Sequence, residues 1–142
     1  MSADALRVLR RWILIVLVVG LTGSGIELLL IEHYEEASQL VPLVLVAASL
    51  GVIVWHVASD SPASVRGLQL MMLLCLAAGA VGMALHFQGA AEFQLEMDPS
   101  MGRTALVKKV MRAKAPPVLA PGVMVQLGLL GLAYAHRWES TK

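Results

Sequence analysis

The sequence predicts an all-α integral membrane protein, an up-down bundle of four transmembrane helices with a short amphipathic helix in the third loop. Of the 142 residues, 58% are hydrophobic and only 15% are charged, against about 25% charged in a typical soluble domain. A soluble domain of this length would leave too much of that apolar surface in water. Four long uncharged runs, joined mostly by short connections, complete the prediction, which treats residues 1–142 as one membrane domain.

The four spans follow from the distribution of charged residues. A hydrocarbon core about 30 Å thick needs about 20 helical residues to cross it. Because only 15 uncharged residues separate Arg11 from Glu27, the first span is expected to include that acid. The predicted spans cover residues 12–31, 40–57, 67–88 and 117–136.

The connections between the spans are predicted from their turn residues. Pro42 suits the first turn of the second helix, where its missing N–H leaves no bond unmade. Residues 59–64, Ser-Asp-Ser-Pro-Ala-Ser, have the composition of a turn between the second and third spans. Residues 88–114 form a long loop, and within it residues 103–113 are expected to form a short helix.

The predicted helix over residues 103–113 is amphipathic. Its apolar residues fall on one side and most of its basic residues on the other. This pattern suits a helix lying in the headgroup region of the bilayer with its basic side outward. A solvated helix that covers the end of the bundle is an equal alternative. The apolar side consists of Leu106, Val107, Val110 and Met111, and the basic side of Lys108, Lys109 and Arg112.

Basic residues around the first span predict the orientation. Arg7, Arg10 and Arg11 precede this span, and no Lys or Arg follows it before Arg66. Cytoplasmic flanks carry an excess of these residues, so the N-terminus is expected in the cytoplasm. An even number of spans then returns the C-terminus to the same side.

The composition argues against several classes of function. A formal net charge of +1 gives no basis for nucleic-acid binding. The single Cys75 excludes an intramolecular disulfide and a cysteine-rich metal site. No Ser-His-Asp order, glycine-rich phosphate loop or cysteine nucleophile stands out, so the chain is not expected to be an enzyme.

Small residues mark the faces on which helices are expected to approach each other. Gly20, Gly23 and Ser24 share a helical stripe with Glu27. Because small residues let helix backbones approach closely in lipid, Glu27 is expected to be buried against a neighbouring helix.

The same design recurs in the third and fourth spans. In the third span, helical spacing places His86 on one face with Gly79 and Gly82. In the fourth span, Gly128 and Gly131 provide a similar contact surface.

Acids and histidines gather at the predicted outer ends of the first and third spans. Both spans are expected to end at that level, which would bring these residues together. Imidazole plus carboxylate is a ligand set for zinc, iron, manganese or another divalent ion. A polar network that only satisfies the helix ends is the simpler alternative. The candidate cluster consists of Glu27, Glu32, His33, His86, Glu92 and Glu96, with His33, His86, Glu92 and Glu96 as the metal ligands.

One histidine near an end of each span makes haem an alternative cofactor. His33 and His86 lie at the outer level, and His56 and His136 at the inner level. Diagonal pairs in a four-helix bundle suit two bis-histidine haems. Aromatic residues make up only 5% of the chain, and His33 and His136 lie beside charges, which weakens this hypothesis.

Three stretches resemble small, uncharacterised four-helix integral membrane proteins of bacteria. They are residues 27–35 (Glu-Leu-Leu-Leu-Ile-Glu-His-Tyr-Glu), residues 85–89 with 92–97, and residues 115–122 with 126–132. The resemblance covers most of the chain. It implies a protein of the bacterial inner membrane without an assigned activity, and it gives no role to His56 or His136.

The leading expectation is a small multi-pass membrane protein without catalytic activity, serving as an accessory subunit of a larger membrane complex. Its partners would be the lipid bilayer and another membrane protein, or a second copy in a homo-oligomer. One alternative is a metal- or haem-binding protein that uses His and Glu at the outer helix ends. Another is a proton or cation carrier that uses Glu27.

Overall fold

The computed structural model describes residues 2–113 and 117–136, and within them the chain forms five α-helices and no β-strand. Three helices are long and apolar enough to cross a membrane, which indicates an integral membrane protein, and a fourth apolar helix is shorter. The all-α prediction is confirmed. The helices are α1 (Ala3–Leu30), α2 (Ala37–Ser59), α3 (Pro62–Met97), α4 (Arg103–Met111) and α5 (Gly122–Ala135).

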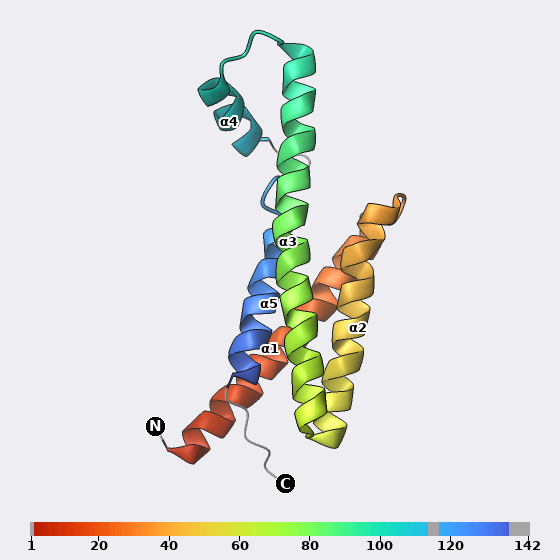
Figure 1. Cartoon of the computed structure of the whole chain (residues 1–142), viewed down its shortest axis with the longest axis vertical. Coiled ribbons are helices and arrows are strands. Elements are labelled where there is room, and N and C mark those ends of the chain that lie inside the picture. The colour runs from red at the N-terminus through yellow and green to blue at the C-terminus, as the bar shows by residue number, and fades with distance from the viewer. Residues whose placement is uncertain (1, 114–116, 137–142) are drawn as a thin grey trace.

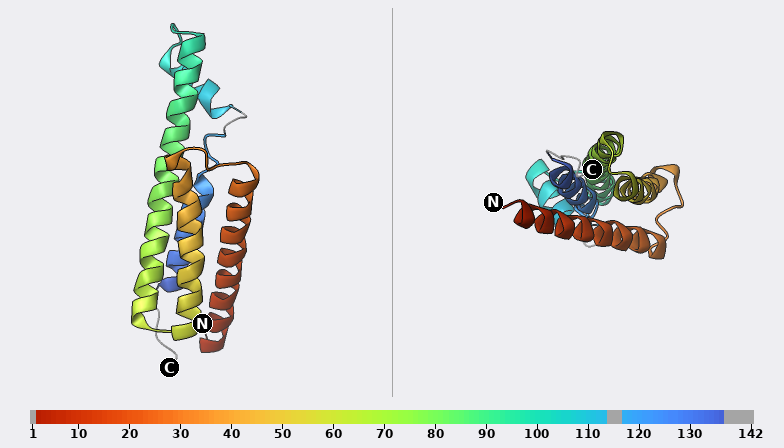
Figure 2. Two further views of the ribbon diagram at one scale, coloured as in Figure 1. Left: turned by 90° about the vertical axis from the view of Figure 1, so that its right-hand side faces the viewer. Right: turned by 90° about the horizontal axis from the view of Figure 1, so that it is seen from below.

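The central element of the bundle is α3, which packs against α5 on one side and α2 on the other (Figure 1). Seen from below, α1 lies across α5 and α2 on the side away from α3 (Figure 2). The helices α1, α2, α3 and α5 run alternately up and down, because short turns join α1 to α2 and α2 to α3.

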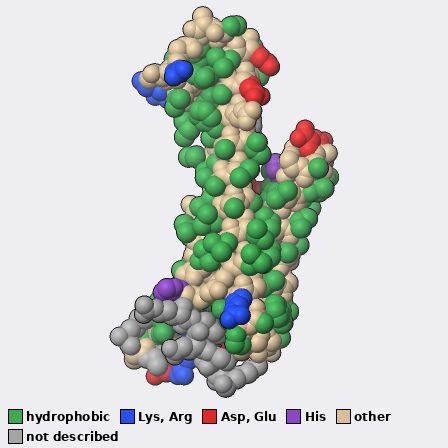
Figure 3. All heavy atoms as spheres, viewed as in Figure 1, with side chains coloured by type: hydrophobic (Ala, Val, Ile, Leu, Met, Phe, Trp, Pro, Cys, Tyr) green, Lys and Arg blue, Asp and Glu red, His purple; other side chains and the backbone are tan. Residues whose placement is uncertain are grey.

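The core is apolar, and so is the outside. Leu17 and Leu21 of α1 meet Leu68 and Met72 of α3 in one cluster, and all four are fully buried. The surface around the middle of the bundle is also hydrophobic, whereas charged side chains gather toward the two ends (Figure 3). Helices that are apolar on every side are expected where lipid takes the place of water.

Close contact between α3 and α5 depends on glycine. A Cβ added at Gly128 would lie 2.6 Å from the carbonyl oxygen of Met72, and one at Gly79 would lie 2.8 Å from the carbonyl oxygen of Pro121. No side chain fits at either position without moving the backbone of the neighbouring segment. The predicted small-residue surfaces of these two helices are therefore confirmed.

The third helix is longer than the predicted span of residues 67–88. It continues to Met97, and its 36 residues correspond to about 54 Å. The expected start of the loop at residue 88 is wrong, because exposed Glu92 and Glu96 are good helix formers and do not interrupt a helix. The short helix predicted over 103–113 is present as α4.

The second helix begins earlier than its apolar residues indicate. It starts at Ala37, so Pro42 lies inside the helix rather than in its first turn, and that prediction is wrong. Glu36, the N-cap of this helix, forms a capping box with Gln39. At the other end, Ser61 caps α3 by accepting the N–H of Ser64 at 3.2 Å.

The fourth predicted span, residues 117–136, is helical only in part. Its helix, α5, has 14 residues, about 21 Å, and turns occupy residues 117–121 before it. Pro121 has no N–H, so it cannot donate to the carbonyl of Pro117. An α-helix that began at residue 117 would therefore lack its first backbone hydrogen bond. The chain instead forms tighter bonds between residues three apart, such as Ala120 N–H to Pro117 at 3.2 Å.

Candidate functional site

Glu27 is exposed in the last turn of α1. The residues of α1 that are buried in the bundle are Leu17, Leu21 and Ser24. Glu27 is exposed, and a Cβ added at Gly23, one turn earlier, would have nothing within 4 Å. The prediction that Glu27 is buried against a neighbouring helix of this chain is wrong. Gly20, seven residues earlier on the same stripe, does pack against α5, since a Cβ added there would lie 2.5 Å from the Leu127 side chain, but Glu27 itself is exposed.

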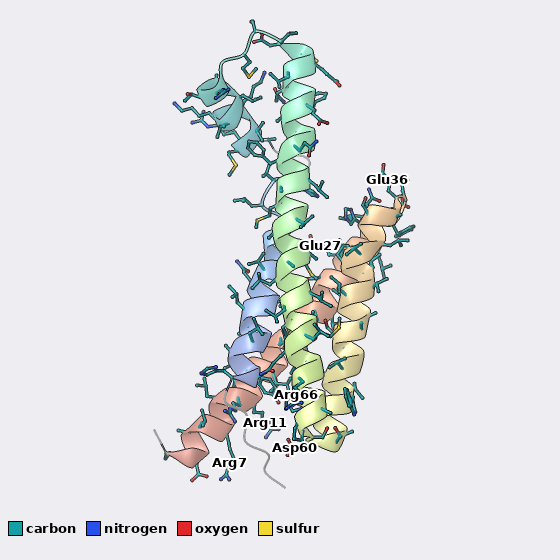
Figure 4. The ribbon with its side chains drawn as sticks, in the orientation of Figure 1. Arg7, Arg11, Glu27, Glu36, Asp60 and Arg66 are labelled. Atoms are coloured by element: carbon teal, nitrogen blue, oxygen red, sulfur yellow. The ribbon has the colours of Figure 1, made fainter. Side chains whose placement is uncertain are left out.

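The carboxylate of Glu27 has no hydrogen-bond or ion-pair partner among residues 2–113 and 117–136. It belongs to the first candidate membrane span, which covers Asp4–Leu30. Figure 4 shows it below the α1–α2 turn that carries Glu36 and well above Arg7 and Arg11. An exposed carboxylate without a described partner thus lies near the end of a candidate membrane-spanning helix.

The other members of the predicted cluster occupy two separate places. Glu32 and His33 lie in the turn after α1, where Glu32 has a positive φ of 56°. Glu92 and Glu96 lie on the part of α3 that rises beyond that turn (Figure 1). Glu92 accepts a hydrogen bond of 2.9 Å from the Gln88 side chain.

The structure therefore does not bring the predicted metal ligands together. Among the residues it describes, no group of three His, Cys, Asp or Glu side chains is placed to hold a metal ion. The separation follows from the length of α3, which carries its acids past the end of α1 instead of ending beside it.

His86 joins α3 to the start of α5. Its Nδ1–H donates to the carbonyl oxygen of Pro117 at 3.1 Å. That carbonyl has no helical donor four residues later, because residue 121 is a proline. His86 lies on the same side of α3 as Gly82, whose added Cβ would meet Pro121 at 2.8 Å. His86 thus donates a hydrogen bond to a carbonyl in residues 117–121, the irregular stretch that precedes α5.

A polar network that the sequence does not reveal lies at the opposite end of the bundle. His56 of α2, Ser64 of α3 and Tyr134 of α5 are all buried, with 2%, 0% and 4% of their surfaces exposed. His56 Nδ1 lies 3.1 Å from Ser64 Oγ, and His56 Nε2 lies 3.2 Å from the Tyr134 hydroxyl. The two rings meet edge to face at 5.7 Å.

The direction of these hydrogen bonds can be deduced. Ser64 Oγ donates its proton to the carbonyl of Ser61 at 2.8 Å, so toward His56 it acts as an acceptor. His56 therefore donates from Nδ1 and accepts the Tyr134 proton at Nε2. In a nucleophilic serine pair the proton runs from serine to histidine, the reverse of this arrangement. The geometry supports a structural role, in which His56 links α2 to α3 and α5 through hydrogen bonds.

The hydrogen bonds of this network involve both ring nitrogens of His56, one of the proposed haem ligands. Both ring nitrogens of His56 are within hydrogen-bond distance of hydroxyl groups, so neither points at an open coordination position. His136 is exposed at the end of α5, where its carbonyl accepts from the Arg10 side chain at 3.2 Å.

Part of the network had a local signal in the sequence. Ser61 and Ser64 have the spacing of a capping pair, which the composition of residues 59–64 suggested only as a turn. Tyr134 had none, because it lies 78 residues after His56 on another helix.

Comparison of the chain with protein-family models, with curated proteins and with solved structures found no match.

Proposed function

We propose that the chain is a non-enzymatic protein of the bacterial inner membrane that serves as an accessory subunit, with α1 binding a transmembrane helix of another membrane protein. The observation that carries the proposal is the exposed carboxylate of Glu27, which has no described partner, on a helix long enough to span the bilayer.

A carboxylate inside a membrane is costly and is almost always turned toward protein or water. Glu27 is exposed and pairs with no described residue of this chain, so the protein environment it needs is supplied by a second molecule. The adjoining surface suits a helix. Gly23 leaves open space one turn away on the same side of the helix. Small residues of this kind allow two helix backbones to approach closely in lipid.

The charge of Glu27 favours a different protein over a second copy of this chain. The described Lys and Arg residues nearest to Glu27 in sequence are Arg7, Arg10 and Arg11, at the other end of α1. Two copies aligned through α1 would therefore place two carboxylates together and bring no cation to them. The expected partner helix carries a Lys, Arg or His, or a hydroxyl or amide donor, at the depth of Glu27.

The proposal includes four crossings with both termini in the cytoplasm. The turns at residues 117–121 add roughly 10 Å at the 3₁₀ rise, so the segment that ends with α5 is about 31 Å long. That length matches the hydrocarbon core. Arg7, Arg10 and Arg11 support the orientation.

Site-specific photocrosslinking in intact cells tests the proposal. A photoreactive residue at Gly23 should give a discrete heterologous adduct, and the adduct should be lost in the Glu27→Ala background. The matched control is the same probe at Val54, which is 69% exposed on α2. The captured protein must also contain a transmembrane helix with a donor at the matching depth.

Three results would contradict the proposal. An adduct of two copies of this chain alone would replace the accessory role with a homo-oligomer. Equal crosslinking from Gly23 and Val54 would show no selective face. An adduct at Gly23 that is indifferent to Glu27→Ala would remove the acid from the interface.

A further inference from the structure

The short helix α4 is held at the level where the apolar part of α3 ends. Fully buried Val110 of α4 packs in one cluster with Ala90, and Phe87 and Ala91 pack against that cluster. The uncharged run of α3, residues 67–91, has 25 residues, whereas about 20 cross a hydrocarbon core. The contact with α4 therefore lies at the end of the crossing, which is the depth of the lipid headgroups.

The charges on this end of the molecule are divided between two sides. Figure 3 shows the basic side chains on the side of α4 and the acidic ones on the side of α3. No ion pair joins the two sets within the described part of the chain. The basic set consists of Arg103, Lys108, Lys109 and Arg112, and the acidic set of Glu92, Glu96 and Asp98.

Beside the cations, α4 also exposes an apolar row. Val107 and Met111 are one helical turn apart and each is 47% exposed. Lys108 and Arg112 form the adjacent row, again one turn apart. A helix at headgroup depth with neighbouring apolar and basic rows is suited to the boundary between acyl chains and phosphates.

We infer that α4 binds the anionic phospholipids of the bilayer that holds the bundle, with Lys108, Lys109 and Arg112 against the phosphates and Val107 and Met111 against the acyl chains. The inference is independent of the role of Glu27. A lipid suits this surface better than an acidic protein, because α4 is fixed at the membrane boundary by its packing on α3 and carries apolar side chains next to its charges.

The test uses the full-length protein in nanodiscs of phosphatidylcholine alone and in nanodiscs that also contain phosphatidylglycerol. A nitroxide attached at Met111→Cys reports depth through its collisions with oxygen, which is enriched in lipid, and with a water-soluble nickel chelate. We expect phosphatidylglycerol to raise the oxygen collisions and lower the nickel collisions.

Charge variants separate lipid binding from simple amphipathic contact. Lys108→Gln with Lys109→Gln should remove the response to phosphatidylglycerol. The same pair should lower the preference for anionic lipid by about fivefold for each lysine, the equivalent of ~1 kcal/mol each. The matched control is Glu92→Gln with Glu96→Gln, which removes two exposed charges from the same end and should keep the response.

The inference would be overturned by equal probe depth in both kinds of nanodisc, or by an unchanged response in the lysine variant. A probe shielded from both collision partners in native membrane vesicles, but in neither nanodisc, would replace the lipid with a protein partner. Circular dichroism confirms that each variant keeps its helices.

Discussion

The Tyr134 hydroxyl donates to Nε2 of His56 across 3.2 Å, and this hydrogen bond joins α5 to α2 on the two sides of α3. Ser64 of α3 accepts from the other ring nitrogen, so one imidazole connects three helices at the end of the bundle that holds Asp60 and Arg66 (Figure 4). Buried polar groups satisfied in this way fix one arrangement of the helices, because any slippage would leave them unpaired.

Replacement of Tyr134 by phenylalanine should destabilise the bundle. The change removes the donor to His56 while it keeps the ring and its edge-to-face contact. Hydrogen bonds between membrane helices contribute about 0.6 kcal/mol on average and up to about 1.7 kcal/mol, and the fully buried site favours the upper part of that range. Unfolding by dodecyl sulfate in bicelles measures the loss.

The control for that change is Tyr34→Phe. Tyr34 is 45% exposed in the turn after α1, so its replacement should alter the free energy of unfolding by less than about 0.5 kcal/mol. Equal losses in the two variants would contradict the role given to the His56 network.

Gly128→Ala should push α3 and α5 apart. The new methyl group would meet the Met72 carbonyl oxygen at 2.6 Å and the Leu76 amide nitrogen at 2.9 Å, both backbone atoms that move only with their helix. Overpacking of this kind costs about 1–3 kcal/mol, measured by the same unfolding titration. Gly51→Ala is the matched control, because nothing lies within 4 Å of its added Cβ, and it should be neutral or slightly stabilising.

His86→Leu should loosen the start of the last segment without unfolding the bundle. The carbonyl of Pro117 would lose the imidazole donor and keep only the bond from Ala120. We expect a loss of about 1 kcal/mol and faster hydrogen exchange at the amides of Ala120 and Gly122. Gln88→Leu on the same helix should leave that exchange unchanged, and a uniform rise along α5 in both variants would count against the local role.

Cys75 should resist maleimide in the folded protein. It is fully buried and its sulfur lies 3.5 Å from the Ser49 hydroxyl. Labelling in nanodiscs should therefore be negligible and should become complete after denaturation in dodecyl sulfate. The double variant Cys75→Ala, Ser100→Cys moves the thiol to the exposed loop between α3 and α4 and should react rapidly. Rapid labelling of native Cys75 would show that the α2–α3 contact opens.

The helices were predictable because charge is excluded from the hydrocarbon core. The uncharged runs predicted α1, α2 and α3, and the small residues Gly79 and Gly128 predicted where α3 and α5 touch. The end of α3 was not predictable in this way, since a helix that has left the lipid tolerates Glu92 and Glu96 on its surface. Pro121 explains why α5 begins later than its apolar run.

The candidate site was harder to predict, because a helical stripe does not show how far along the helix its neighbours extend. Gly20 and Ser24 do face the bundle, but Glu27, farther along the same stripe, is exposed in the last turn of α1. The pairing of His56 with Tyr134 depends on two helices that are distant in sequence, so no local pattern encodes it.

The bond from Arg10 to the carbonyl of His136 closes a loop of 126 residues. During synthesis, α1 emerges first and can dock on α2 as soon as that helix is made, but its contact with α5 must wait for the last apolar segment. Until then α1 is held on one flank only, with Glu27 facing the lipid. The first helix to enter the membrane is thus among the last to be fixed, and this interval is the time when a partner helix has the freest access to it.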